Sequence, residues 1–379
     1  MDFELSKEHR MAQTLFRDFA KKEIKPIAHE IDESERFPLE TVQKMGKIGM
    51  LGLPYDKKYG GQGAGYLTYA LAMEAVSACD GSHGIIMSVH TSLCCGVLNA
   101  FGTEEQKMKY LVPLAKGEYL GAFGLTEPSA GTDAAGTQTK AVLDGDEYVI
   151  NGSKIFITNS GFADVYTIFA MTDKSKGARG LSCFIIEKDT PGFTVGKPEL
   201  KMGIRASAAC ELIFNNVRIP KENMVGMEGK GFGIAMKALD GGRIGIAAQA
   251  VGLAQGALEE VVAYVKERKQ FGKPLSAFQN TQFTLADMEA RIQAARLLVY
   301  RAACTQDAGK PYTVPAATAK LIASETASWV ANRAVQLMGG YGFMREFNSE
   351  RIMRDAKITE IYEGTSEVMR MVISGALLK

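Results

Sequence analysis

Apolar residues in the first third of the chain recur at steps of three and four, the spacing of one face of an α-helix. The clearest run spans residues 7–31, and Ser6 is placed to cap its first turn. Its apolar positions are Met11, Leu15, Phe16, Phe19 and Ile24. A Gly-rich turn at residues 60–65 leads into another helical stretch; it could cradle an anion, but such turns more often join helices. The pattern predicts a helical N-terminal domain over residues 1–117.

The pattern changes near Gly117 to short β-branched and aromatic runs such as GAFGLTE, EYVI, KIFITN and LSCFIIE, separated by turn residues. These runs are typical of strands. The dipeptides Asp144-Gly145 and Asn151-Gly152 are those preferred in tight hairpins, and the second lies between two of the runs. We therefore expect a middle antiparallel β domain over residues 118–225, with hairpin turns at these dipeptides.

Helical spacing returns after Gly233 and continues in the run TAKLIASETASWVANRAVQLMGG. One apolar face of the first helix in this block comprises Leu253, Ala257, Leu258, Val261, Val262 and Val265. Residues 226–379 are therefore predicted to form a C-terminal helical bundle. The order of helical, β and helical blocks gives an α+β fold class. A chain of 379 residues exceeds what one core usually supports, so an enclosed site between domains is expected.

Composition and charge narrow the function classes. Hydrophobic residues make up 46% and charged residues 23%, and we see no run of about 18 apolar residues that would span a membrane. The net charge of +1 provides no field that would attract nucleic acid. The first residues, MDFELSKEHR, fit neither a secretory signal nor a transit peptide, so a cytoplasmic location is expected. The six cysteines show no CxxC pair, which favours reduced thiols over disulfides or a metal site.

The common catalytic signatures do not occur: there is no GxxxxGK[ST] loop, no HExxH and no GxSxG. The four histidines, His9, His29, His83 and His90, all lie in the first quarter of the chain. Hydrolase and metalloenzyme functions are therefore disfavoured, and no metal is expected. What remains is the loop FGLTEPSAGTDAAG, rich in hydroxyls and amides, which could bind a flat heteroaromatic ring or a phosphate but equally resembles a plain loop. Arg268 follows a helix, where a cation either stabilises the helix dipole or binds phosphate.

Several motifs occur together in one order. They are FGLTEPSAGTDAAG, NGSKIFITNSG, ALDGGRIGIAAQAVGLAQGA, RKQFGKPLSAFQ, QLMGGYGF and IYEGTSEV. In these motifs the whole chain resembles the acyl-CoA dehydrogenase family, and it is most similar to the short-chain, butyryl-CoA type. The resemblance implies a helical N-terminal domain, a middle β domain and a C-terminal four-helix bundle. It also implies FAD bound between them, usually in a homotetramer.

The resemblance assigns flavin contacts to two parts of the chain. The isoalloxazine ring would be lined by Phe123, Leu125, Thr126, Thr132, Phe156, Ile157 and Thr158. Family members often carry Trp where this chain has Phe156. The pyrophosphate and adenosine part of an FAD held mainly by a neighbouring subunit would be reached by Arg268, Phe271, Gln279, Gln336, Leu337, Gly339 and Gly340. The two glycines also fit a helix C-cap. Thr365 and Glu367 would open the last helix, whose N-terminus could face flavin or phosphate.

The same resemblance assigns the chemistry to Glu363. The family converts a saturated acyl thioester to its 2-enoyl form: a base removes the α proton while a hydride leaves the β carbon for flavin N5. A carboxylate suffices if the substrate is aligned and water is excluded. In isovaleryl- and long-chain-type members the base lies instead at the position that is Gly242 here, and glycine cannot remove a proton. This absence strengthens the assignment to Glu363.

Substrate contacts are also implied. Asp240 and Arg243 would contact the CoA portion, Gly364 would lie against the acyl thioester, and Thr132 would also contact the substrate. Without the resemblance, Asp240 and Arg243 would be interpreted as an exposed ion pair within one helix, worth only tenths of a kcal/mol.

The expected activity is FAD-dependent dehydrogenation of short-chain acyl-CoA, with electrons passed to an electron-transfer flavoprotein. The reaction could also run in reverse, as enoyl-CoA reduction. An acyl-CoA oxidase of the same fold is an alternative, although oxidases are typically longer. The third possibility, a flavoprotein of this fold that binds nucleic acid or a partner without catalysis, is disfavoured by the near-neutral charge.

Overall fold

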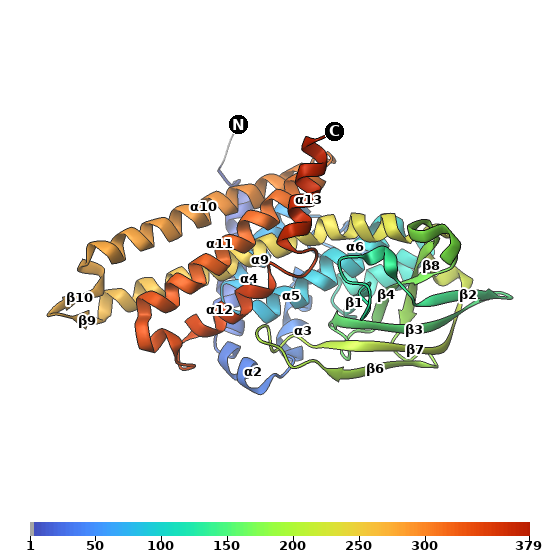
Figure 1. The fold of residues 1–379 in the computed structure, drawn as a ribbon, viewed down its shortest axis with the longest axis horizontal. Helices are drawn as coiled ribbons and strands as arrows, with labels where there is room; N and C mark the ends of the chain where they lie inside the picture. The colour runs from blue at the N-terminus through green and yellow to red at the C-terminus, as the bar shows by residue number, and fades with distance from the viewer. Residues whose placement is uncertain (1–3) are drawn as a thin grey trace.

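The computed structural model describes residues 4–379 and places a β domain between two helical blocks. The first three residues, which begin the segment used to argue against a targeting signal, lie outside the described residues. In Figure 1 the sheet occupies one end of an elongated molecule, and long helices run from it to the other end. The α+β fold class and the order of the blocks are thus confirmed; the domain limits stay predictions.

The N-terminal block is helical, as predicted. Its helices are α1 (Lys7–Phe19), α2 (Ala28–Ser34), α3 (Leu39–Lys47), α4 (Gly65–Ser77), α5 (Gly81–Ser88), α6 (Gly96–Phe101), α7 (Glu104–Gln106) and α8 (Val112–Ala115). Ser6 caps α1 by accepting a hydrogen bond from the His9 backbone N–H at 3.2 Å. Phe16 is buried, but Met11 and Leu15 are 64% and 57% exposed. The predicted apolar face therefore packs inward along only part of its width.

One long apolar helix in the N-terminal block bears on the expectation that the chain does not span a membrane. The continuous helical stretch Gly81–Phe101 is long and apolar enough to cross a membrane by length and composition. Some of its polar groups bond inside the protein: Thr91 donates to the Leu51 carbonyl at 2.9 Å. Because 78% of the apolar window is buried within the protein, the stretch is accounted for as a core helix.

The middle block is a sheet with the strand order β6-β7-β3-β2-β4-β5-β8, with β1 beside β4. The strands are β1 (Gly121–Gly124), β2 (Lys140–Asp144), β3 (Glu147–Thr158), β4 (Val165–Met171), β5 (Leu181–Glu187), β6 (Phe193–Pro198), β7 (Ala209–Pro220) and β8 (Met224–Val225). Most pairings are antiparallel, as predicted, although β1 and β2 each pair with β4 in parallel.

The two predicted hairpin turns have different outcomes. Asp144-Gly145 forms the turn between β2 and β3, as predicted. Asn151-Gly152 does not form a turn: it lies inside β3, where the pairing with β7 shifts register between Ile150 and Gly152. A Cβ at Gly152 would come within 2.7 Å of the Thr139 Cα. The glycine therefore permits a bulge and a close strand contact rather than a reversal of the chain.

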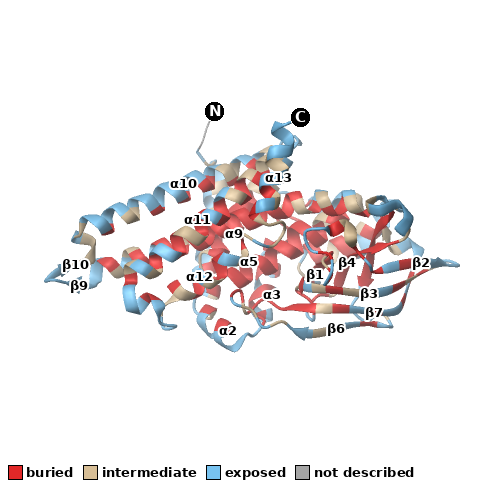
Figure 2. Cartoon of the chain, viewed as in Figure 1, coloured by how far each residue is buried: buried red, intermediate tan, exposed pale blue. Residues whose placement is uncertain are grey.

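The C-terminal block is a bundle, as predicted. Its helices are α9 (Gly231–Glu267), α10 (Gln279–Asp307), α11 (Thr313–Met338), α12 (Asn348–Ile358) and α13 (Ser366–Leu377), with β9 (Lys269–Gln270) and β10 (Lys273–Pro274) pairing between α9 and α10. Buried residues of α4, α9, α10 and α11 form one continuous core. Figure 2 shows this core as red stretches along α9 and its neighbours.

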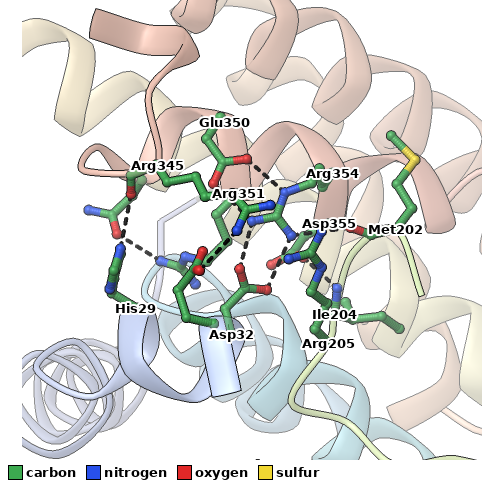
Figure 3. A network of polar contacts seen from close by, with 12 residues as sticks. His29, Asp32, Met202, Ile204, Arg205, Arg345, Glu350, Arg351, Arg354 and Asp355 are labelled. Atoms are coloured by element: carbon green, nitrogen blue, oxygen red, sulfur yellow. Dashed lines mark hydrogen bonds and ion pairs between the residues drawn. The ribbon is translucent and has the colours of Figure 1, made fainter. Parts of the chain in front are cut away.

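Helix α12 is fixed by a network of charged groups shown in Figure 3. Arg354 bridges Asp32 of α2 at 2.6 Å and Glu350 at 2.7 Å. Arg351 pairs with Asp80 at 2.9 Å. The Asp355 carboxylate accepts the Ile204 backbone N–H, from the connection between β6 and β7, at 2.5 Å. The network ties all three blocks to α12, and the chain that leaves α12 leads directly to Glu363.

Candidate active site

Glu363 lies in the short connection between α12 and α13. Its backbone is left-handed, with φ of 53°, and the next residue, Gly364, has φ of 101°. Helix α13 begins after Thr365, whose side chain accepts from the Val368 N–H at 3.3 Å, so the predicted start of the last helix is confirmed. A left-handed non-glycine residue is strained, and it persists only where surrounding contacts hold it.

The contacts that hold this connection come from α9 and α11. Arg243 of α9 donates from Nε to the Glu363 carbonyl at 3.4 Å. Lys320 of α11 donates from Nζ to the Gly364 carbonyl at 2.5 Å. The Tyr362 hydroxyl donates to Gln249, which in turn donates to the Gly81 carbonyl at 2.8 Å. The backbone around Glu363 is thus anchored on both sides, which fixes where its side chain points.

The carboxylate of Glu363 has an unusual environment. Both of its oxygens are buried and have no hydrogen-bond partner among the described residues. Burial raises the pKa of Glu363 to about 8, while the nearby charges of Lys320 and Arg243 oppose this rise. A buried carboxylate without partners is costly, and such groups cluster at functional sites. The group is free to accept a proton from a bound molecule.

The glycine at the alternative base position explains how the carboxylate fits. A Cβ at Gly242 would lie 1.9 Å from Oε2 of Glu363 and 2.8 Å from a methyl carbon of Leu93. A side chain at position 242 and the carboxylate of Glu363 would therefore occupy the same space. Because Gly242 has no side chain, it leaves room for the carboxylate of Glu363.

Asp240 and Arg243 lie beside this site on α9. Their side chains pair at 2.8 Å and are 8% and 6% exposed, respectively, so the interpretation as an exposed ion pair was wrong. Asp240 also accepts a hydrogen bond from Thr313 of α11 at 2.5 Å. Burial by α11 is a tertiary effect that spacing within one helix does not reveal. The buried pair fixes Arg243 in position to reach the Glu363 carbonyl.

The predicted ring-binding residues come from β1, the loop after it and the end of β3. Phe123, Leu125 and Ile157 are buried, whereas Phe156 is 61% exposed and has φ of 61°. The Ile155 N–H donates to the Thr126 carbonyl at 2.9 Å, which joins the end of β3 to the loop after β1. In the described part of the chain, no hydrogen bond involves the hydroxyls of the threonines in this group, Thr126, Thr132 and Thr158.

The chemistry of these side chains is of the kind that an isoalloxazine ring requires. An exposed aromatic ring can stack on a flat heteroaromatic group, and unpaired hydroxyls can donate to its polar edge. The loop is anchored by a buried carboxylate. The side chain of Glu127 accepts the backbone N–H of Gln138 at 2.6 Å and pairs with Lys154 at 2.7 Å. The threonine hydroxyls thus lie on backbone that these contacts hold in place.

The second predicted flavin group lies elsewhere. Arg268 ends α9, and its guanidinium lies 5.3 Å from the ring centroid of Tyr341, which follows α11. Phe271 is 93% exposed at the tip of the α9–α10 connection. Gln279 begins α10, and Gln336, Leu337, Gly339 and Gly340 lie at the end of α11, where Gly339 is the C-cap. Figure 1 shows β9 and β10, beside this group, at the end of the molecule opposite the sheet. One chain does not bring the two groups together.

Sequence reasoning missed several residues of the site. Lys320, Gln249 and Tyr362 hold the connection that carries Glu363, and the Glu127–Lys154 pair supports the ring-binding loop. The available signal was a lysine within the otherwise apolar run TAKLIAS, since a buried charge usually has a specific partner. Residues 4–379 contain no group of three or more His, Cys, Asp or Glu side chains arranged to hold a metal, and the cysteines in that range are free thiols.

Comparisons with known proteins cover the whole chain. Family models described as the acyl-CoA dehydrogenase N-terminal, middle and C-terminal domains match residues 6–118, 122–217 and 229–378. The short-chain specific acyl-CoA dehydrogenase of Clostridium acetobutylicum is 60% identical over 379 residues, covering 100% of both chains.

Solved structures agree with the sequence comparisons. Butyryl-CoA dehydrogenase from Megasphaera elsdenii is 53% identical over 100% of both chains, with a TM-score of 0.98. A chain from work on the electron transferring flavoprotein of Acidaminococcus fermentans is also 53% identical over 100% of both chains, with a TM-score of 0.99. The chain belongs to the acyl-CoA dehydrogenase family.

Proposed function

We propose that the protein dehydrogenates short-chain acyl-CoA, converting butyryl-CoA to crotonyl-CoA, and that Glu363 removes the α proton. The observation that carries this assignment is the buried carboxylate of Glu363, whose oxygens have no partner among the described residues. Family membership supports the reaction class, and the short-chain and butyryl-CoA relatives support the substrate class. A group left without partners in the free protein gains one when the substrate α carbon is placed beside it.

FAD is the cofactor of this family, and when bound it accepts the hydride that leaves the β carbon of the substrate. We assign its ring contacts to the predicted residues on β1, in the loop after it and at the end of β3. The exposed ring of Phe156 provides a stacking surface, and Thr126, Thr132 and Thr158 provide free hydroxyl donors. Donors at the polar edge of the ring stabilise negative charge that develops there.

The chain's own residues align and activate the proton transfer. The anchored connection holds Glu363 in one position, which removes much of the entropy cost of reaching the transition state. Burial raises the pKa of its carboxyl to about 8, so the group binds a proton readily near neutral pH. Asp240 and Arg243 would contact the CoA portion, and Gly364 would lie against the thioester. Glu367, in the first turn of α13, is exposed and suits the helix N-terminus rather than a second base.

The separation of the two flavin groups supports an assembly in which subunits share each site. Arg268, Phe271, Gln279 and the end of α11 would contact an FAD whose ring lies in a neighbouring subunit. We propose a homotetramer on this basis, built as a dimer of dimers. In such an assembly Phe271, which is 93% exposed in one chain, would lie against the neighbouring subunit.

We further propose an electron-transfer flavoprotein as the redox partner and the cytoplasm as the location. The structural relative from work on the Acidaminococcus electron transferring flavoprotein supports the first. Free cysteines, several of them buried, are consistent with a reducing compartment.

The proposal is tested by mixing purified holoprotein with acyl-CoA substrates of increasing chain length under argon and following flavin bleaching. Butyryl-CoA should bleach the flavin fastest. Little bleaching with butyryl-CoA, together with rapid bleaching by long chains, would contradict the substrate assignment. Repeating the reaction in air tests the oxidase alternative, because rapid oxygen uptake would favour it. No bleaching with any acyl-CoA, together with retarded DNA in a gel, would favour the non-catalytic alternative.

A further inference from the structure

Lys320 is a buried cation next to the proposed base. It lies within α11 and is 0% exposed, and its Nζ donates to the Gly364 carbonyl at 2.5 Å. Burial lowers the pKa of Lys320 to about 8, and the charge of Glu363 opposes this decrease. A lysine is rarely buried without a specific partner. Here the partner atom is a backbone carbonyl one residue beyond Glu363, not the carboxylate itself.

The groups that face this region come from several elements. Arg243 approaches Glu363 from α9, but its guanidinium is paired with Asp240 at 2.8 Å. The hydroxyls of Tyr69 on α4 and of Tyr362 interact electrostatically with Glu363. Besides Glu363 and Arg243, the charges acting on Lys320 are those of Glu360 and Glu367, near the two ends of the connection. Among the described residues, Lys320 therefore supplies a positive charge near Glu363 that no direct ion pair holds.

We propose that Lys320 is a positioning residue for Glu363: its ammonium holds the Gly364 carbonyl and supplies a positive charge that favours the ionised form of the neighbouring carboxylate over its protonated form. This inference rests on the proposed function of Glu363 as the base. The arrangement separates two effects of a cation. Its charge favours the ionised carboxylate, but its hydrogen bond is made to the backbone, so both carboxylate oxygens stay available to the substrate.

The arrangement has a clear physical advantage over direct contact. An ammonium bonded to the carboxylate would lower its proton affinity strongly and occupy an oxygen needed for proton removal. A cation that bonds to the backbone instead still opposes the effect of burial on the carboxylate. It also holds Gly364, whose φ of 101° belongs to the connection that orients Glu363. One residue would thus control both the geometry and the protonation of the base.

The test is the pH dependence of flavin reduction by butyryl-CoA under argon, measured for wild type and two variants that remove the charge. Lys320→Met removes the charge and the hydrogen bond, whereas Lys320→Gln keeps a donor for the Gly364 carbonyl. In both variants the acid limb of the rate profile should move to higher pH by about one unit. At a pH on the acid side of this limb, the rate of flavin reduction should therefore fall by about tenfold. The rate should recover at high pH in Lys320→Gln.

Lys320→Arg keeps the charge and should leave the acid limb near its wild-type position, which separates the effect of charge from that of altered packing. A second readout is the infrared band of the protonated Glu363 carboxyl, whose titration midpoint should rise in Lys320→Met even without substrate. Variants that retain flavin but keep the wild-type acid limb and infrared midpoint would overturn the proposal. If wild type itself is not reduced by any acyl-CoA, the proposed function fails instead, and the infrared midpoint still decides the role of Lys320.

Discussion

Two buried lysine–glutamate pairs in this protein have opposite arrangements. In the first, Lys154 contacts Glu127 directly at 2.7 Å, and the carboxylate also accepts the Thr139 N–H at 3.1 Å. Burial acts to raise the pKa of Glu127, but Lys154 and the other donors outweigh it, and the net shift is downward. In the second, Lys320 bonds to a carbonyl, the oxygens of Glu363 have no partner among the described residues, and burial raises the pKa of Glu363 to about 8.

The difference shows that burial of a carboxylate next to a lysine does not by itself decide its role. What decides it is whether the acceptor positions of the carboxylate are filled. The carboxylate of Glu127, whose acceptor positions are filled, favours its ionised form and supports the loop after β1. The carboxylate of Glu363, whose acceptor positions are unfilled, is available for proton transfer.

The largest expected effect is that of Glu363→Gln. Glutamine has nearly the same shape but cannot remove a proton, so the rate of flavin reduction by butyryl-CoA should fall by about 10³-fold or more. Stopped-flow absorbance under argon measures this rate, and the flavin content of the purified variant checks that the fold is intact. Reduction at the wild-type rate would remove Glu363 from the mechanism.

The next largest effect is expected on stability, and it tests the direct ion pair between Lys154 and Glu127. Lys154→Met leaves the Glu127 carboxylate buried without its cation, which should lower the free energy of unfolding by about 3–5 kcal/mol. Urea unfolding at pH 7 with excess FAD measures the change. The double variant Lys154→Met with Glu127→Gln is the matched control and should recover part of the loss. A Lys154→Met protein as stable as wild type would show that the pair does not support the loop.

The variant Gly242→Ala tests whether the absence of a side chain at position 242 is needed to accommodate the carboxylate of Glu363. The added Cβ would lie 1.9 Å from Oε2 of Glu363, so the carboxylate must move. Misplacement of a catalytic group by about 1 Å costs about 10²-fold in rate. Flavin reduction should slow by about that factor, with flavin still bound. Gly233→Ala is the control, because a Cβ there meets no atom within 4 Å. Equal rates for the two variants would contradict the assigned geometry.

Asp355 provides an intermediate case, and its effect should be the smallest. One oxygen accepts the Ile204 N–H, while the other is buried without a partner, and burial raises the pKa of Asp355 to about 7. A carboxyl whose folded pKa is raised contributes stability at low pH that is lost as the pH rises toward that value. Wild type should therefore lose stability relative to Asp355→Asn by about 1 kcal/mol between pH 6 and pH 7. Urea unfolding at pH 6 and pH 7 measures the free energies of unfolding of the two proteins. A difference between them that does not change with pH would show that Asp355 does not titrate in this range.

Much of this fold could be predicted from the sequence because periodicity is local. The helical and β blocks followed from the spacing of apolar residues, and Ser6 was identified as a cap from its place before the first turn. Asn151-Gly152 was misassigned because the register of β3 depends on β7, which is distant in sequence. The exposure of Asp240 and Arg243 was misjudged because α11 covers them.

The candidate site depended more on resemblance than on physical pattern. The motif around Glu363 identified the carboxylate, and Gly242 supported it. Lys320 lies in α11, and α12 separates α11 from Glu363 in the sequence. No local sequence pattern therefore joins Lys320 to Glu363. Its presence in an apolar helical run was a signal of burial, but not of the atom that it would contact.

Glu363 is buried, its oxygens have no hydrogen-bond partner among the described residues, and it is able to hold a proton near neutral pH. This protonation is measured by the infrared difference between wild type and Glu363→Gln across pH 5 to 9, with both proteins carrying Asp355→Asn to remove the other carboxyl whose pKa is raised. We expect a protonated-carboxyl band at pH 6 that disappears with a midpoint near 8, the pKa that burial gives Glu363. A carboxylate already fully ionised at pH 6 would contradict it.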